Sequence, residues 1–153
     1  VEKIELCAPV SGTVKALSDV PDKTFAEKVL GDGAAIVPEE GKVYAPADGT
    51  VANIMDSKHG IMFVTDSGAE VLIHIGLDTV NLKGKYFKSY VSDGDKVKKG
   101  TLLVEFDLEA IKGEGYNLIT PMVVTNISDY IKAVCMEKEN TAINAGDKFL
   151  TVV

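Results

Sequence analysis

The stretch that most constrains the fold of this chain is residues 56–78, which has the pattern of a β-hairpin. Two apolar runs are separated there by an Asp-Ser-Gly sequence at residues 66–68. β-Branched and aliphatic residues on either side of such a cluster are typical of two antiparallel strands joined by a tight turn. The stretch also contains both histidines of the protein, His59 and His74. The hairpin therefore predicts that the two imidazoles come together.

The register of this hairpin depends on the length of its loop. A two-residue loop of Asp66 and Ser67 places His59 directly opposite His74, with Cβ atoms roughly 4.5–5.5 Å apart. A three-residue loop, with Gly68 in a left-handed conformation, shifts the pairing by one residue. The imidazoles remain neighbours under either register, whereas the face that they share differs.

Neighbouring imidazoles have two main chemical uses. Histidine titrates near neutrality, is a good nucleophile when neutral and is a common metal ligand. The pair therefore predicts either a phosphorylatable histidine with a helper or part of a metal centre. A zinc hydrolase needs a third ligand and an open coordination position, for which Asp56, Asp66 and Asp78 are candidates. Neither H-x-H nor H-E-x-x-H occurs, so this hydrolase is kept only as the alternative.

Composition excludes several classes of function. The chain has 153 residues, enough for one domain (1–153) with a substantial core. Its net charge of −7 argues against binding to nucleic acid. No apolar run approaches the length that spans a bilayer, so no direct membrane insertion is expected. No Walker loop is present.

The isolated Cys7 and Cys135 are expected to be free thiols, buried in a protein of the reducing cytoplasm, although a disulfide between them stays open.

Repeated turn signals indicate the fold class. The sequence A-P-V-S-G-T-V at residues 8–14 returns as A-P-A-D-G-T-V at residues 45–51, which suggests two strand–turn–strand units. Short apolar segments with turn signals every 8–12 residues point to an all-β protein. We therefore expect an antiparallel β-sandwich or partly closed barrel with short helical turns. One such turn is expected at residues 108–111 and another at residues 128–133, after a strand at residues 121–127.

Between the two repeats, residues 21–38 are expected to contain one or two helical turns. Phe25, Val29 and Leu30 lie at helical spacing before Gly31. These side chains either cover the core or form an exposed apolar patch for a partner protein. The pattern alone favours neither interpretation.

Residues 94–107, G-D-K-V-K-K-G-T-L-L-V-E-F-D, resemble the turn and strand of biotinyl and lipoyl carrier domains. Those domains present a lysine at the tip of a hairpin. The nearest approach here, Met136-Glu137-Lys138, lacks the flanking pattern. The likeness is therefore attributed to shared sandwich geometry.

A more extensive resemblance covers nearly the whole chain from Ile4. The motifs are V-P-D-x-x-F-A-E-K-x-x-G-D-G-x-A-I-x-P at residues 20–38, A-P-x-D-G-T at residues 45–50, and H-x-G-x-D-T-V-x-L-K-G at residues 74–84. Together with the interval between the two histidines, they resemble the glucose-type IIA component of the bacterial sugar phosphotransferase system. The resemblance implies an antiparallel β-sandwich, a phosphocarrier role and no cofactor.

The resemblance also implies a role for each matched residue. His74 would accept the phosphoryl group on Nε2, and His59 would support its transfer. The hydroxyl of Ser57 would bond to Nδ1 of His59, and the carbonyl of Gly76 to Nδ1 of His74. The rim and apolar surroundings of the site, which would meet partner proteins, are expected from Asp22, Phe25, Val29, Leu30, Met55, Met62, Leu72 and Asp78.

The partners implied by the resemblance are proteins. The phosphoryl donor would be the general phosphocarrier protein HPr, and the acceptor a cysteine of the IIB domain of a sugar permease. Regulatory target proteins are a further expectation. His59 and His74 could contribute to a zinc site shared with a partner, although no metal is required for the phosphocarrier role.

Overall fold

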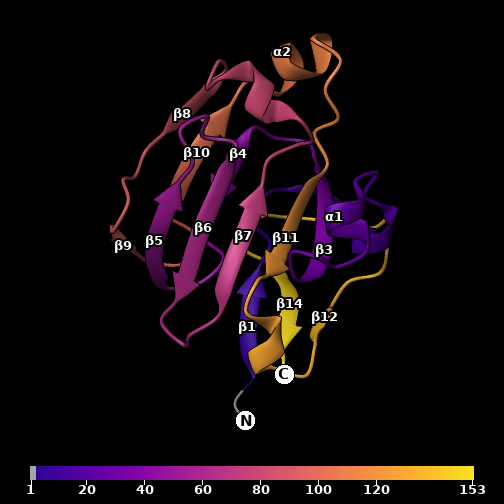
Figure 1. Cartoon of the computed structure of the whole chain (residues 1–153), viewed down its shortest axis with the longest axis vertical. Coiled ribbons are helices and arrows are strands. Elements are labelled where there is room, and N and C mark those ends of the chain that lie inside the picture. Colours follow the sequence, from indigo (N-terminus) through magenta and orange to yellow (C-terminus); the bar gives the residue numbers. More distant parts are fainter. Residues whose placement is uncertain (1–2) are drawn as a thin grey trace.

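The computed structural model describes residues 3–153 and consists of antiparallel β-sheets with short helices between some strands (Figure 1). An eight-stranded sheet has the order β13-β2-β3-β11-β7-β6-β5-β9, and two three-stranded sheets have the orders β1-β14-β12 and β4-β10-β8. The strands are β1 (Ile4–Cys7), β2 (Gly12–Ala16), β3 (Asp32–Pro38), β4 (Lys42–Tyr44), β5 (Gly49–Ile54), β6 (Gly60–Thr65), β7 (Glu70–His74), β8 (Phe87–Ser89), β9 (Lys96–Val97), β10 (Leu102–Phe106), β11 (Thr120–Val124), β12 (Ala133–Cys135), β13 (Ala142–Ile143) and β14 (Lys148–Val152). The expected antiparallel β-sandwich is confirmed.

The hairpin of β6 and β7 adopts the second of the two expected registers. Thr65 N–H donates to the carbonyl of Ala69 (2.9 Å), so the loop has three residues, and Gly68 has φ +103°. Gly60 is consequently opposite His74. The two-residue loop is therefore wrong, because glycine at position 68 readily takes a positive φ that closes the longer loop.

The repeated sequence motifs bond to each other. Cys7 N–H donates to the carbonyl of Pro46, and Tyr44 N–H donates to the carbonyl of Pro9, both over 2.8 Å. Because Tyr44 and Pro46 follow Cys7 and Pro9 by the repeat offset, these bonds are equivalent and relate the two units by an approximate twofold axis. Each unit also pairs with a later strand, β1 with β14 and β4 with β10. The two units predicted from the repeat are thus parts of one fold.

The central strands of the large sheet are buried on both faces. Along β7, Val71 and Ile73 belong to the main core, whereas Leu72 points to a second apolar cluster on the other face. β11 alternates in the same way, with Val123 in the second cluster. Burial of each such side chain stabilises the fold by about 1.5–3 kcal/mol. A second buried face is unusual for an antiparallel sheet, which often leaves one face in water, and here it underlies the histidine pair.

The helical segments are short, and the two α-helices begin at capping side chains. Those of α type are α1 (Lys23–Ala26) and α2 (Leu108–Gly113), and the 3-10 turns are η1 (Leu17–Asp19), η2 (Thr79–Leu82) and η3 (Ile127–Asp129). Asp22 and Asp107 cap α1 and α2 by accepting backbone N–H bonds. The helical turns expected at residues 21–38 and 108–111 are confirmed. The strand expected at residues 121–127 ends earlier, at Val124, and Ile127 begins η3.

Both cysteines are free thiols, as expected. Cys7 is buried, whereas Cys135 is only partly buried because β12 is at an edge of its sheet.

Candidate functional site

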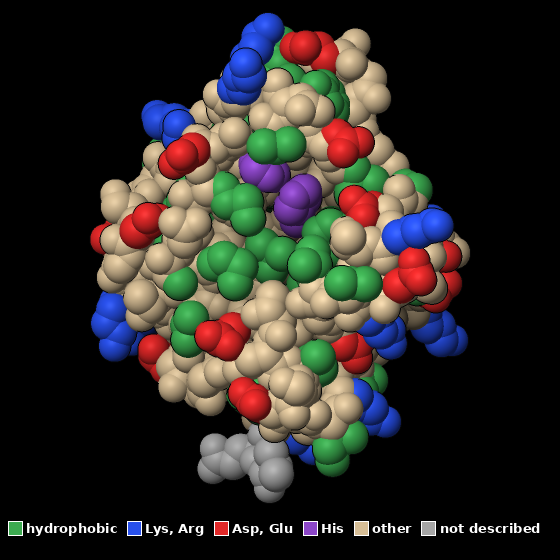
Figure 2. Space-filling model, viewed as in Figure 1, with side chains coloured by type: hydrophobic (Ala, Val, Ile, Leu, Met, Phe, Trp, Pro, Cys, Tyr) green, Lys and Arg blue, Asp and Glu red, His purple; other side chains and the backbone are tan. Residues whose placement is uncertain are grey.

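Both histidines lie at the same end of the β6–β7 hairpin. His74 is the last residue of β7, and His59 directly precedes β6. Their ring centroids are 4.9 Å apart and the rings meet edge to face at 83°. His59 is 5% exposed and His74 is half-buried. Figure 2 shows the two imidazoles together on one face of the molecule, beside a group of apolar side chains.

The orientation of the His74 ring is determined by a backbone contact. Nδ1 lies 2.6 Å from the carbonyl oxygen of Gly76. Since a carbonyl oxygen can only accept, Nδ1 carries the proton and Nε2 keeps its lone pair. The expected contact with Gly76 is confirmed. It depends on glycine, because φ is +77° and an added Cβ would lie 2.8 Å from Cγ2 of Thr79.

The hydrogen bonding of His59 differs from the expected arrangement. Its Nδ1 is buried and has no hydrogen-bond partner among residues 3–153, so the expected bond from Ser57 is not formed. Ser57 lies within a tight turn in which Lys58 N–H donates to the Met55 carbonyl over 2.7 Å. Lys58 then takes a left-handed φ of +59°. The chain thus reverses between Ser57 and His59, and the bond that the family resemblance implied is wrong for this structure.

Burial keeps both imidazoles in the neutral form. It is the main cause that lowers the pKa of His59, and the neighbouring His74 lowers that pKa further. Burial also lowers the pKa of His74. The Gly76 carbonyl and the Asp22 and Asp78 carboxylates partly offset this effect. At neutral pH the His74 ring therefore has a free lone pair at Nε2.

An apolar cluster surrounds the histidine pair on the outer face of the large sheet. The Phe25 ring centroid lies 5.3 Å from that of His74. Four expected residues are part of this cluster or pack against it: Phe25, Met55, Met62 and Leu72. Sequence reasoning missed the remaining members, which are Leu17, Val20, Ala35, Val37, Leu77, Ile119 and Val123. The largely apolar run of β11, in which every residue is buried, was a signal for one of them, Val123.

The two aspartates expected at the rim of the site, Asp22 and Asp78, place negative charge near His74. Asp22 caps α1 and accepts a bond from Thr24 N–H over 3.0 Å. Asp78 is exposed, with a left-handed φ of +60°, and precedes η2. Both carboxylates favour a positive charge on His74. They add negative charge to an otherwise apolar surface.

The sequence comparison identifies the family. Residues 4–130 match the family described as "phosphoenolpyruvate-dependent sugar phosphotransferase system, EIIA 1". The chain belongs to this EIIA family. Family membership agrees with a neutral histidine at an accessible apolar site and supports a phosphocarrier role.

Curated relatives and a solved structure agree with the assignment to EIIA. The chain is 46% identical over 146 residues to the PTS system glucose-specific EIIA component of Halalkalibacterium halodurans, with 95% of this chain and 83% of that protein covered. It is 53% identical over 123 residues to the PTS system beta-glucoside-specific EIIBCA component of Bacillus subtilis, with 80% of this chain covered. It spans about 20% of the length of that protein. Glucose permease IIA from Mycoplasma capricolum superimposes with a TM-score of 0.87 at 31% identity, covering 99% of this chain and 96% of that one.

Two expected partner residues of the EIIA chain lie outside the apolar cluster. Val29 is 70% exposed and Leu30 is 40% exposed, in the segment that joins α1 to β3. Phe25 therefore covers the core, whereas Val29 and Leu30 form an exposed patch. Each of the two interpretations that the sequence left open thus holds for part of this segment.

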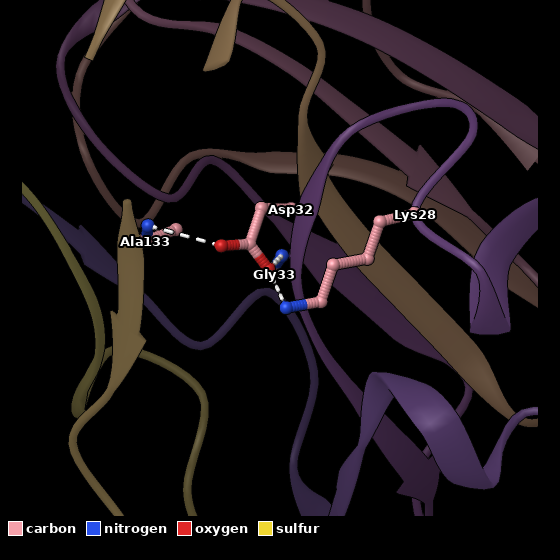
Figure 3. A network of polar contacts seen from close by, with 4 residues as sticks. All are labelled: Lys28, Asp32, Gly33 and Ala133. Atoms are coloured by element: carbon pink, nitrogen blue, oxygen red, sulfur yellow. Dashed lines mark hydrogen bonds and ion pairs between the residues drawn. The ribbon is translucent and has the colours of Figure 1, made fainter. Parts of the chain in front are cut away.

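The segment that carries Val29 and Leu30 is anchored at both ends. The carboxylate of Asp32 accepts from Gly33 N–H (2.9 Å) and from Ala133 N–H of β12 (3.3 Å). Lys28 Nζ lies 3.3 Å from the same carboxylate (Figure 3). Asp32 therefore joins this segment to a strand that is about a hundred residues away in sequence.

Within residues 3–153 no group of three or more His, Cys, Asp and Glu side chains is arranged to hold a metal ion. Asp56, Asp66 and Asp78 thus do not complete a three-ligand site with the imidazoles, and the comparisons provide no support for a zinc hydrolase. Among the described residues, no more than two such side chains are therefore close enough to share one metal ion at this site. Over the same residues, no helix has the length and apolar character needed to cross a bilayer.

Proposed function

We propose that this EIIA chain carries a phosphoryl group on Nε2 of His74, receives it from phosphorylated HPr and donates it to a cysteine of a IIB domain. The observation that carries the proposal is the Nδ1 contact with Gly76, which leaves Nε2 of a neutral ring unprotonated. Names of relatives such as the EIIBCA component join A with B and C components, which supports a IIB partner. In this proposal the transfer takes place in the cytoplasm.

In the first step, the Nε2 lone pair of His74 attacks the phosphorus of the HPr phosphohistidine. A new N–P bond forms as the N–P bond to HPr breaks, and the HPr imidazole leaves with the electron pair. The Nδ1–H of His74 is retained throughout, so no base has to remove a proton. In the second step the cysteine thiolate of IIB attacks the same phosphorus, and neutral His74 leaves.

Alignment and charge stabilisation account for most of the catalysis. Phosphoryl transfer passes through a loose transition state in which charge spreads over three oxygens. His74 contributes a fixed direction of attack because its ring is held by Gly76. His59 is the neighbouring group that can donate a hydrogen bond to those oxygens. His59 is therefore assigned a supporting role in transfer.

The apolar surroundings protect the phosphorylated site and dock partners. Phosphohistidine is hydrolysed by water, and a docked protein would exclude water from the cluster that contains Phe25 and Leu72. The exposed Val29 and Leu30 extend the apolar surface available to a partner. The net charge of −7 favours encounter with a basic partner.

Mass spectrometry tests the proposal. The chain is incubated with phosphoenolpyruvate and the general phosphotransferase enzymes, with HPr omitted as the control. The expected result is a gain of about 80 Da that is labile in acid and stable in base, only when HPr is present. No mass gain with active HPr would contradict the phosphocarrier assignment.

A further inference from the structure

The contact between His74 and Gly76 depends on a turn that has its own buried support. β7 ends at His74, and the chain then reverses through two left-handed residues, Gly76 (φ +77°) and Asp78 (φ +60°). A non-glycine residue in this conformation is strained, although aspartate tolerates it better than most. The turn therefore needs stabilising contacts to hold the Gly76 carbonyl against the ring.

Thr79 supplies such a contact from inside the fold. Its side chain is 0% exposed, and its hydroxyl donates to the carbonyl of Ile75 over 2.6 Å. Ile75 is the residue between His74 and Gly76, and it is the first residue beyond β7. Its carbonyl is thus fixed by a side chain that follows the turn.

The other side of Ile75 is fixed by the second histidine. Ile75 N–H donates to the carbonyl of His59 over 2.6 Å. The methyl group of Thr79 also packs against Gly76, since a Cβ added there would lie 2.8 Å from Cγ2. The Thr79 hydroxyl thus holds Ile75 through a hydrogen bond, and the Thr79 methyl group packs against the adjacent residue, Gly76.

We propose that Thr79 is a positioning residue for phosphoryl transfer, whose buried hydroxyl holds the 75–76 peptide so that the Gly76 carbonyl keeps His74 in its Nδ1–H tautomer. The proposal rests on the proposed function of His74. Thr79 itself touches no partner, because no part of it is exposed. It acts on the reacting nitrogen only through Ile75 and Gly76.

Two comparisons at position 79, Thr with Val and Ser with Ala, isolate the effect of the hydroxyl. Thr79→Val keeps the branched shape and removes the hydroxyl. Thr79→Ser restores the hydroxyl and removes the methyl, and Thr79→Ala removes both. The comparison of Ser with Ala still decides the question if the valine variant does not fold. Thr65→Val is the control, because Thr65 is also a buried threonine with a hydrogen-bonded hydroxyl but lies at the loop end of the same hairpin.

The first readout is the ¹⁵N spectrum of the imidazoles, which reports the tautomer without any transfer reaction. Wild type, Thr79→Ser and Thr65→Val are expected to show a single Nδ1–H tautomer for His74. Thr79→Val and Thr79→Ala are expected to show a mixture of tautomers. A single Nδ1–H tautomer in both variants that lack the hydroxyl would overturn the proposal.

The second readout is acceptance of the phosphoryl group from phosphorylated HPr. Loss of the hydroxyl should lower the maximal rate by about tenfold or more, since small misalignments are costly in transfer reactions, with KM unchanged. Thr79→Ser should stay within about twofold of wild type. Equal losses in the serine and alanine variants, or in Thr65→Val, would overturn the positioning role. Absence of acceptance in wild type would instead refute the proposed function and leave the tautomer result valid.

Discussion

The carbonyl oxygen of Gly76 lies 2.6 Å from Nδ1 of His74 and thereby determines which nitrogen of that ring is free to react. The contact joins two residues of one strand end, so it forms locally once β7 and its turn have folded. The partner ring of His59 lies 4.9 Å away, between ring centroids. The site therefore combines one ring of defined tautomer with a second ring as a neighbour.

Substitution of Gly76 should damage both stability and transfer. Gly76→Ala places a side chain at φ +77° and brings its Cβ to 2.8 Å from Thr79 and 3.1 Å from the Asn117 carbonyl. We expect a loss of more than about 1–2 kcal/mol in the free energy of unfolding, measured by urea denaturation, with loss of acceptance. Gly146→Ala is the control, since Gly146 has a similar φ of +93° with no atom near its added Cβ. Equal destabilisation by the two substitutions would show that the crowding at Gly76 has no effect.

Ser57 should have little influence on the site. Its hydroxyl does not bond to Nδ1 of His59, so Ser57→Ala removes no hydrogen bond of that nitrogen. We expect the rate of acceptance from phosphorylated HPr to change by less than about twofold and stability to change by less than about 0.5 kcal/mol. A loss comparable to that of a histidine substitution would mean that the hydroxyl does support His59 during transfer.

His59 should matter more for donation than for acceptance. Because Nε2 of His74 is already unprotonated, His59→Gln is expected to leave acceptance from HPr largely intact. Donation to IIB should fall by about tenfold or more, because the glutamine amide donates from a different position than the imidazole and cannot become positively charged beside the phosphoryl oxygens. Single-turnover kinetics of the two steps measure the effect. Equal losses in both steps would contradict the supporting role assigned to His59.

The buried imidazoles should make stability depend on pH below neutrality. Their folded-state pKa values lie below the ordinary 6.5, so the unfolded chain takes up protons that the folded chain does not. Stability from this source is complete above about pH 6.5 and is lost as the pH falls towards the folded-state values. Urea denaturation from pH 7.5 to 5.5 should show a smaller decline for the double variant His59→Gln, His74→Gln. An identical decline in wild type and variant would contradict the lowered pKa values.

Val29 should contribute to docking and not to folding. Val29→Asp puts a charge on a side chain that is 70% exposed, so stability should change by less than about 0.5 kcal/mol. KM for phosphorylated HPr should rise several-fold, because the apolar surface beside α1 is interrupted. Ile131→Asp is the matched control at an 81% exposed position before β12. The same rise in KM for both variants would argue for a general effect of charge.

Local sequence patterns predicted much of the fold and the reacting pair. The Asp-Ser-Gly loop indicated the hairpin, but its register depended on whether Gly68 took a positive φ, which the sequence left open. The histidines are neighbours in either register, so this choice did not affect the pairing of His59 with His74. The repeat at residues 8–14 and 45–51 indicated two related units, whereas their mutual hydrogen bonds required the structure.

The less predictable features of the site arise from contacts between distant segments. Ile119 and Val123 line the outer cluster because β11 lies beside β7, which no local pattern of either strand specifies. The family resemblance implied a bond from Ser57 to His59, but the chain turns between them at Lys58, which has a left-handed φ, and the bond is not formed. In the sequence Thr79 is simply the residue after Asp78, and no pattern there indicates its contact with Ile75. That contact exists only because the turn reverses the chain.

The proposed function requires that Nε2 of His74 carries the phosphoryl group. The most direct test is NMR of the phosphorylated protein with ¹⁵N-labelled histidine, in which coupling to ³¹P identifies the bonded nitrogen. We expect coupling to Nε2 of His74 alone, with Nδ1 still protonated. Coupling to Nδ1 of His74, or to either nitrogen of His59, would contradict it.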